Sequence, residues 1–110
     1  MAFTFTKVAY DPAGKKAIYT ATTDTSSAAS TLNPGFTPNR VVILDSTNAN
    51  RYEWNAGMAD ASLFKTVTAG TFTYVSSNGI TPAASTAQQG VIIGTAVHTN
   101  SSTYSIVLEG

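Results

Sequence analysis

The sequence contains no cysteine and little charge: 11% of its 110 residues are Asp, Glu, Lys or Arg, and the formal net charge is +0. Without cysteine there is no disulfide framework, zinc–thiolate cluster or thiol nucleophile. A balanced charge removes the electrostatic attraction that drives most nucleic-acid binding, so we expect no direct nucleic-acid partner. Soluble domains typically carry roughly 25% charged residues, so this chain has an unusually weakly charged surface.

Long hydrophobic runs and histidines are also scarce. The aliphatic run at residues 41–44 is far shorter than the ~20 residues that span a bilayer, so no membrane segment is predicted. His98 is the single histidine, and the sequence lacks the Gly-x-Ser-x-Gly motif of many hydrolases. The acidic residues show no metal-ligand spacing, and no phosphate-binding glycine loop is present. The sequence therefore predicts no enzyme, no cofactor and no metal site.

Threonine, serine and asparagine supply most of the polar side chains, and they favour strands and turns over helices. Apolar and polar side chains alternate clearly in residues 51–55 and 103–108, and more weakly in residues 16–22 and 71–75, which predicts strands. Their apolar faces give the core candidates Tyr52, Trp54, Phe72, Tyr104, Ile106 and Leu108. Arg51 and Glu53 share the opposite face and are expected to form an exposed ion pair.

The N-terminal segment shows a change of phase. Phe3 and Phe5 lie on one face of a strand while Val8 and Tyr10 lie on the other, which predicts a bulge or a sheet corner. A turn at residues 11–14 then joins the first two strands in a hairpin.

About eight short strands predict an all-β fold, an antiparallel β-sandwich or jelly roll, with a small β-barrel as the alternative. We expect a single domain over residues 1–110, in which residues 1–10 form either a strand or an extended N-terminal arm. Residues 22–39 and 76–89 lack periodicity and are expected to be loops. Residues 57–62 have room for one helical turn.

Four segments occur in a distinctive order: residues 35–42 (GFTPNRVV), 52–60 (YEWNAGMAD), 65–71 (KTVTAGT) and 79–81 (GIT). This order resembles small structural proteins of tailed bacteriophages, of the kind assigned as capsid decoration (cement) proteins or minor virion proteins, and is most like the decoration proteins. The resemblance implies a β-rich fold and a non-enzymatic role on the outer surface of the virion capsid. It also implies the major capsid protein as partner and a homo-oligomer such as a trimer. It transfers no catalytic residues.

Two groups of residues are candidates for the contacts of such a protein. Phe3, Phe5 and Lys7 are the candidates for capsid contact, because an aromatic terminal strand can leave its domain and add to a neighbouring sheet. Strands that are apolar on both faces are typical of central or interface-covered positions. They give the protomer-interface candidates Val41, Val42, Ile43, Leu44, Val91, Ile92 and Ile93. For both groups the alternative is the core of a single subunit.

Two other functions stay open. A tail or fibre module that binds glycans would expose aromatic side chains in a concave site, so a buried Trp54 and no surface tyrosine cluster would count against it. A tail-tube component would assemble into rings. The low charge fits any of these assemblies, because short hydroxyl and amide side chains lose little entropy on contact.

Overall fold

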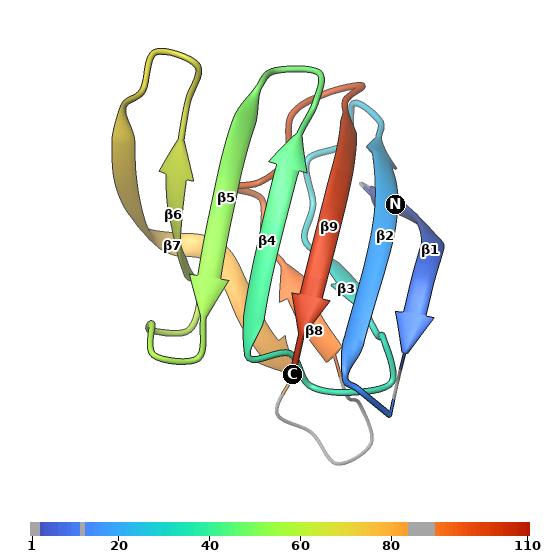
Figure 1. The fold of residues 1–110 in the computed structure, drawn as a ribbon. Helices are drawn as coiled ribbons and strands as arrows, with labels where there is room; N and C mark the ends of the chain where they lie inside the picture. Colours follow the sequence, from blue (N-terminus) through green and yellow to red (C-terminus); the bar gives the residue numbers. More distant parts are fainter. Residues whose placement is uncertain (1–2, 12, 84–89) are drawn as a thin grey trace.

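The computed structural model describes residues 3–11, 13–83 and 90–110, which form one sheet of nine antiparallel strands. The strands are β1 (Phe3–Asp11), β2 (Lys16–Thr23), β3 (Ser30–Leu32), β4 (Arg40–Asp45), β5 (Asn50–Asn55), β6 (Ser62–Thr66), β7 (Phe72–Ala83), β8 (Gly90–Ile93) and β9 (Thr103–Glu109). Their order is β1-β2-β9-β4-β5-β6-β7-β8-β3, and the sheet curls into a nearly closed barrel (Figure 1). The all-β prediction is confirmed.

The predicted sandwich is wrong, and the alternative of a small barrel fits the structure better. A sandwich needs two separate sheets, whereas here each strand is hydrogen-bonded to its neighbour from β1 to β3. Strands also occupy both stretches that were expected to be loops. β2 extends to Thr23, β3 covers Ser30–Leu32, and β7 continues to Ala83. The remainder of the second stretch, residues 84–89, lies outside the described residues. Residues 57–62 form turns and the start of β6 instead of a helical turn.

A bend in β7 turns the corner of the barrel. Leu63 of β6 pairs with Val75 of β7, whereas the adjacent Ser62 pairs with Ile80. Residues 76–79 of β7 therefore form a bulge between these two pairs. Asn78 has a positive φ of 59°, and a Cβ on Gly79 would collide with the Ser62 carbonyl. The Ser, Asn and Gly content that predicted a loop here is the chemistry of this bend.

The edges of the sheet are β1 and β3. A register shift between Lys7 and Ala9 confirms the predicted change of phase in β1 and identifies it as a bulge. After the bulge, the Tyr10 hydroxyl lies against Gly35, just beyond β3, where any side chain would collide with it. Gly35 also has a φ of +84°, which favours glycine. This contact helps to bring the two edges together.

The inner face of the barrel holds one hydrophobic core. Its largest fully buried side chains are Trp54, Tyr52, Tyr104, Phe3, Ile43, Leu63, Ile80, Ile93, Ile106, Leu108, Val41 and Val91. Every second side chain of β2, β4, β5 and β9 points into this core, so the side chains between them form the outer face of the same strands. Within the described part of the chain, no helix has the length and hydropathy needed to cross a membrane.

Candidate functional site

The outer face carries a line of side chains that runs across the sheet from β1 to β7. The cross-strand register joins Ala9, Ile18, Val107, Val42, Glu53, Phe64 and Tyr74 in that order, and we call these residues the outer row. All but Glu53 are apolar or aromatic. Neighbouring side chains in such a line contact one another across strands, so the row forms a continuous surface. Glu53 divides it into an aliphatic half over β1, β2, β9 and β4 and an aromatic half over β6 and β7.

Phe72, which pairs with Thr66 beside the row, extends its aromatic half, so that Phe64, Phe72 and Tyr74 form a cluster of three rings. Phe64 and Phe72 are stacked with centroids 4.7 Å apart and planes 7° apart, and Tyr74 is tilted against Phe64 at 5.2 Å. Phe72 is 64% exposed and Tyr74 is 50% exposed. Aromatic pairs in these geometries hold each other in place, so the cluster is a preformed apolar surface.

The aliphatic half is flanked by further exposed apolar side chains. Val8, in the bulge of β1, is 61% exposed, and Leu44 lies two residues from Val42 on the same face of β4 and is also exposed. Ile18 is exposed as well, whereas Val42 is covered by its neighbours. A contiguous exposed apolar patch on a soluble protein marks an interaction surface more often than a single apolar side chain does.

A charged row borders the aliphatic half. Cross-strand pairing joins Asp11, Lys16, Glu109 and Arg40 in that order, on the same outer face. Arg40 Nη1 donates to Glu109 Oε1 over 2.8 Å, and Asp11 Oδ1 accepts a bond of 3.0 Å from the Gly14 amide in the hairpin turn. The charges therefore alternate in sign along the row.

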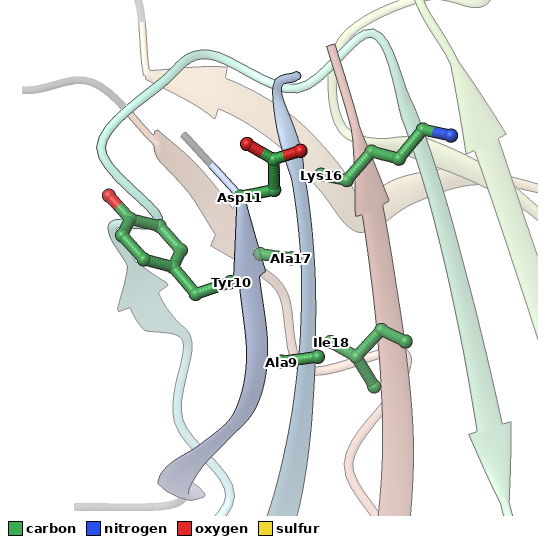
Figure 2. A pocket seen from close by; sticks show the side chains of 6 residues that line it. All are labelled: Ala9, Tyr10, Asp11, Lys16, Ala17 and Ile18. Atoms are coloured by element: carbon green, nitrogen blue, oxygen red, sulfur yellow. The ribbon is translucent and has the colours of Figure 1, made fainter. Parts of the chain in front are cut away.

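A shallow groove of about 330 Å³ lies at the β1–β2 end of both rows. It is lined by Ala9, Tyr10, Asp11, Lys16, Ala17 and Ile18. In Figure 2 the Tyr10 ring points away from Ile18 and Lys16, so these side chains do not enclose the groove. Its lining combines outer-face residues with Tyr10 and Ala17, which lie on the inner-facing side of their strands, so the groove lies where the two faces meet at the edge strand β1.

The buried acid Asp45 organises the opposite end of β4 and is 2% exposed. Its Oδ1 accepts the amide protons of Thr47 and Asn48, and its Oδ2 accepts bonds from Asn48 Nδ2 and Thr99 Oγ1, all within 3.1 Å. The Thr99 hydroxyl also lies 2.7 Å from the Tyr104 hydroxyl. These contacts tie the β4–β5 turn to the segment before β9, so the acid is committed to holding two loops together.

His98 lies beside the aromatic side chain of Phe3. Its ring packs edge-on against Phe3 with centroids 5.8 Å apart, and its buried Nε2 has no hydrogen-bond partner among the described residues. Within the same part of the chain, no group of three or more His, Asp or Glu side chains could hold a metal ion.

The predicted capsid contacts lie in β1. Phe3 is fully buried between His98 and Tyr104, Phe5 is half-buried and stacks on Phe3 at 5.8 Å, and Lys7 is exposed with Nζ 4.0 Å from the centre of the Tyr10 ring. β1 pairs with β2 from Phe3 to Asp11. A contact that uses the Phe3 ring would therefore require β1 to leave the barrel.

The protomer-interface candidates divide between the two faces. Val41, Ile43, Val91 and Ile93 lie in the core of this chain. The others alternate with them in β4 and β8: Val42 is covered, Leu44 is exposed and Ile92 is half-buried. Only this second group offers any surface to another molecule.

The core candidates Tyr52, Trp54, Tyr104, Ile106 and Leu108 are buried. Phe72 instead lies on the outer surface. Alternation places Phe72 and Tyr74 on one face of β7 but leaves open which face points inward, and pairing with Thr66 and Phe64 puts both rings outside.

Sequence reasoning missed the outer row as a unit. Its members come from seven strands, and the row exists because β9 inserts between β2 and β4. The local signals were apolar residues at Ile18 and Val107 on the polar faces of their strands, the strand at residues 41–44 that is apolar on both faces, and the aromatic alternation in residues 71–75. No family model, curated protein or solved structure matches this chain.

Proposed function

We propose that this chain is a non-enzymatic decoration (cement) protein of a tailed bacteriophage, which binds the outer surface of the assembled capsid where subunits of the major capsid protein meet. The observation that carries the proposal is the exposed aromatic half of the outer row. Burying such a surface against another protein removes apolar side chains from water and so stabilises the complex. The phage-like order of sequence segments supports the major capsid protein as that partner.

The contact that we propose is the cluster of Phe64, Phe72 and Tyr74 on the β6–β7 hairpin. Aromatic side chains are enriched where protein interfaces are strongest, because they bury a large area at a small cost in side-chain entropy. The N-terminal residues suit this role less well. Phe3 fills the core, so moving it to a capsid would expose Tyr104 and His98 to water.

The mechanism requires only binding. A protein that binds the assembled lattice more tightly than free capsid subunits stabilises the lattice by that difference in binding free energy. Repetition over many equivalent sites converts weak single contacts into a strong total effect. A weakly charged surface suits permanent packing of this kind, because 11% of the residues carry charge.

Electron microscopy of the virion tests the proposal. The protein must appear on the outer face of the head, in copies that follow the icosahedral lattice, with the β6–β7 hairpin against the capsid. Phe72→Ser combined with Tyr74→Ser should reduce head occupancy at least about tenfold, whereas Val8→Ser, which removes an exposed apolar side chain elsewhere, should not. Absence from the head, or full occupancy of the double variant, would overturn it.

A glycan-binding tail or fibre module is a second candidate, since Tyr74 and Phe72 are exposed together and aromatic rings bind sugar faces. Trp54 weighs against it, because this indole is 2% exposed and donates to the Ala59 carbonyl within the fold. Titration with host surface glycans, followed by perturbation of the Tyr74 and Phe72 signals in NMR spectra, separates the two. A tail-tube component would instead form rings, which mass measurement reveals.

A further inference from the structure

The charged row that borders the aliphatic half of the outer row has alternating charges, so it is electrostatically complementary to a second copy that runs in the opposite direction. The charged row reads negative, positive, negative, positive through Asp11, Lys16, Glu109 and Arg40, one residue from each of β1, β2, β9 and β4. Figure 1 shows these four strands side by side. A row with this order can face a reversed copy of itself with an opposite charge at every position.

A two-fold axis that runs along the strands, between β2 and β9, produces this reversal. It turns a second copy over and places the partner's Arg40 opposite Asp11 and the partner's Glu109 opposite Lys16. An axis placed on β2 would instead set Lys16 against the same residue of the second copy. Among axes that run along these strands, the one between β2 and β9 sets all four charges of the row against opposite charges.

The same operation matches the neighbouring rows. In the outer row, Ile18 faces the partner's Val107, and Ala9 faces the partner's Val42. In the next row, Thr20 faces the partner's Ser105, because these two residues are paired across β2 and β9 within one chain. Apolar side chains thus meet apolar ones and hydroxyls meet hydroxyls. Since the barrel is convex, the closest contact falls on β2 and β9.

We propose that the chain forms a two-fold symmetric dimer with a second copy of itself through the outer face of β1, β2, β9 and β4. This dimer replaces the trimer that the phage resemblance implies. It leaves the cluster of Phe64, Phe72 and Tyr74 free, so the dimer and the proposed capsid contact use separate surfaces. The dimer does not depend on the proposed function.

Sedimentation analysis of the full chain across a dilution series tests the dimer. The wild type should form a dimer, and Ile18→Lys or Val107→Lys should weaken association at least about tenfold, because each places an ammonium group in the apolar centre of the contact. Thr71→Lys adds the same charge between β6 and β7, outside the face, and should leave the dimer intact. Circular dichroism checks that each variant keeps the fold.

A charge exchange tests the axis itself. The double variant Lys16→Glu/Glu109→Lys keeps opposite charges facing each other in its own dimer, but it opposes like charges when paired with the wild type. Mixing it with ¹⁵N-labelled wild type and recording native mass spectra should give far fewer mixed dimers than random exchange. A wild-type monomer or trimer, a dimer unaffected by Ile18→Lys and Val107→Lys, or mixed dimers in random proportion would each overturn the proposal. None of these outcomes changes the occupancy expected on phage heads.

Discussion

The inner and outer faces of the barrel are built from the same strands and are both rich in apolar side chains, yet only the inner face is covered within one chain. On β5, Trp54 and Tyr52 are fully buried, whereas on β7, Phe72 and Tyr74 stand in solvent. The inner side chains are needed for folding, and we infer that the outer ones are needed for contact with other molecules. Hydrophobicity alone does not separate the two roles. The strand register and the curvature of the sheet do.

The largest expected effect comes from a matched pair of truncations on the two faces. Trp54→Ala removes a fully buried side chain and its hydrogen bond to the Ala59 carbonyl, and should cost about 3–5 kcal/mol of unfolding free energy. Phe72→Ala removes a side chain that is 64% exposed and should cost less than about 1 kcal/mol. Chemical denaturation measures both. Similar losses for the two variants would show that the outer aromatic cluster also supports the fold.

The next effect tests whether the buried acid at the end of β4 belongs to the folding interior. Asp45→Ala removes the acceptor for four hydrogen bonds, so the Thr47 and Asn48 amides and the Thr99 hydroxyl lose a partner. We expect a loss of about 1–3 kcal/mol, measured by denaturation. Asp45→Asn keeps a carbonyl acceptor and should lose less. An Asp45→Ala protein as stable as the wild type would mean that water replaces the carboxylate without cost.

The strands were predictable because their signals are local. Alternation in residues 51–55 and 103–108 marks β5 and β9, and the change of phase between Phe5 and Val8 marks the bulge of β1. The barrel was not predictable in the same way, because it depends on the bend at Gly79, where the residue types equally favour a loop. Alternation likewise showed that Phe72 and Tyr74 share a face without showing which face.

The candidate surface was less accessible to sequence reasoning than the fold. Ile18 and Val107 are 89 positions apart in the sequence numbering and become neighbours only when β9 inserts between β2 and β4. The charge alternation of Lys16, Glu109 and Arg40 has the same origin. A surface composed across strands is a property of strand order, and strand order is set by long-range pairing that no short segment encodes.

A third, smaller effect is the loss of stability at high pH that the buried Tyr52 of the inner face should produce. Burial raises the pKa of the Tyr52 hydroxyl from 10.0 to about 12, because the phenolate is poorly solvated in the core. The unfolded chain therefore releases this proton near pH 10 while the folded chain still holds it. Stability is full below pH 10 and should fall by about 1 kcal/mol per pH unit between pH 10 and 12. Thermal melts across this range measure the fall, and Tyr52→Phe should reduce it. An unchanged slope in that variant would contradict the assignment.

The smallest expected effect concerns the ion pair between Arg51 and Glu53, the charged residue that interrupts the apolar outer row. Arg51 Nε donates to Glu53 on the solvent side of β5, which confirms the predicted ion pair. Both side chains are exposed, so water competes with the pair and Arg51→Ala should change the unfolding free energy by only about 0–1 kcal/mol. Glu53→Gln should have a similarly small effect on the unfolding free energy, and added salt should shrink both differences.

Because Glu53 separates the aliphatic half of the row from the aromatic half, its replacement by an apolar residue should instead alter solubility and association. If Arg51→Ala destabilised the chain as much as Asp45→Ala, the outer face would share in folding, and the distinction between the two faces would fail.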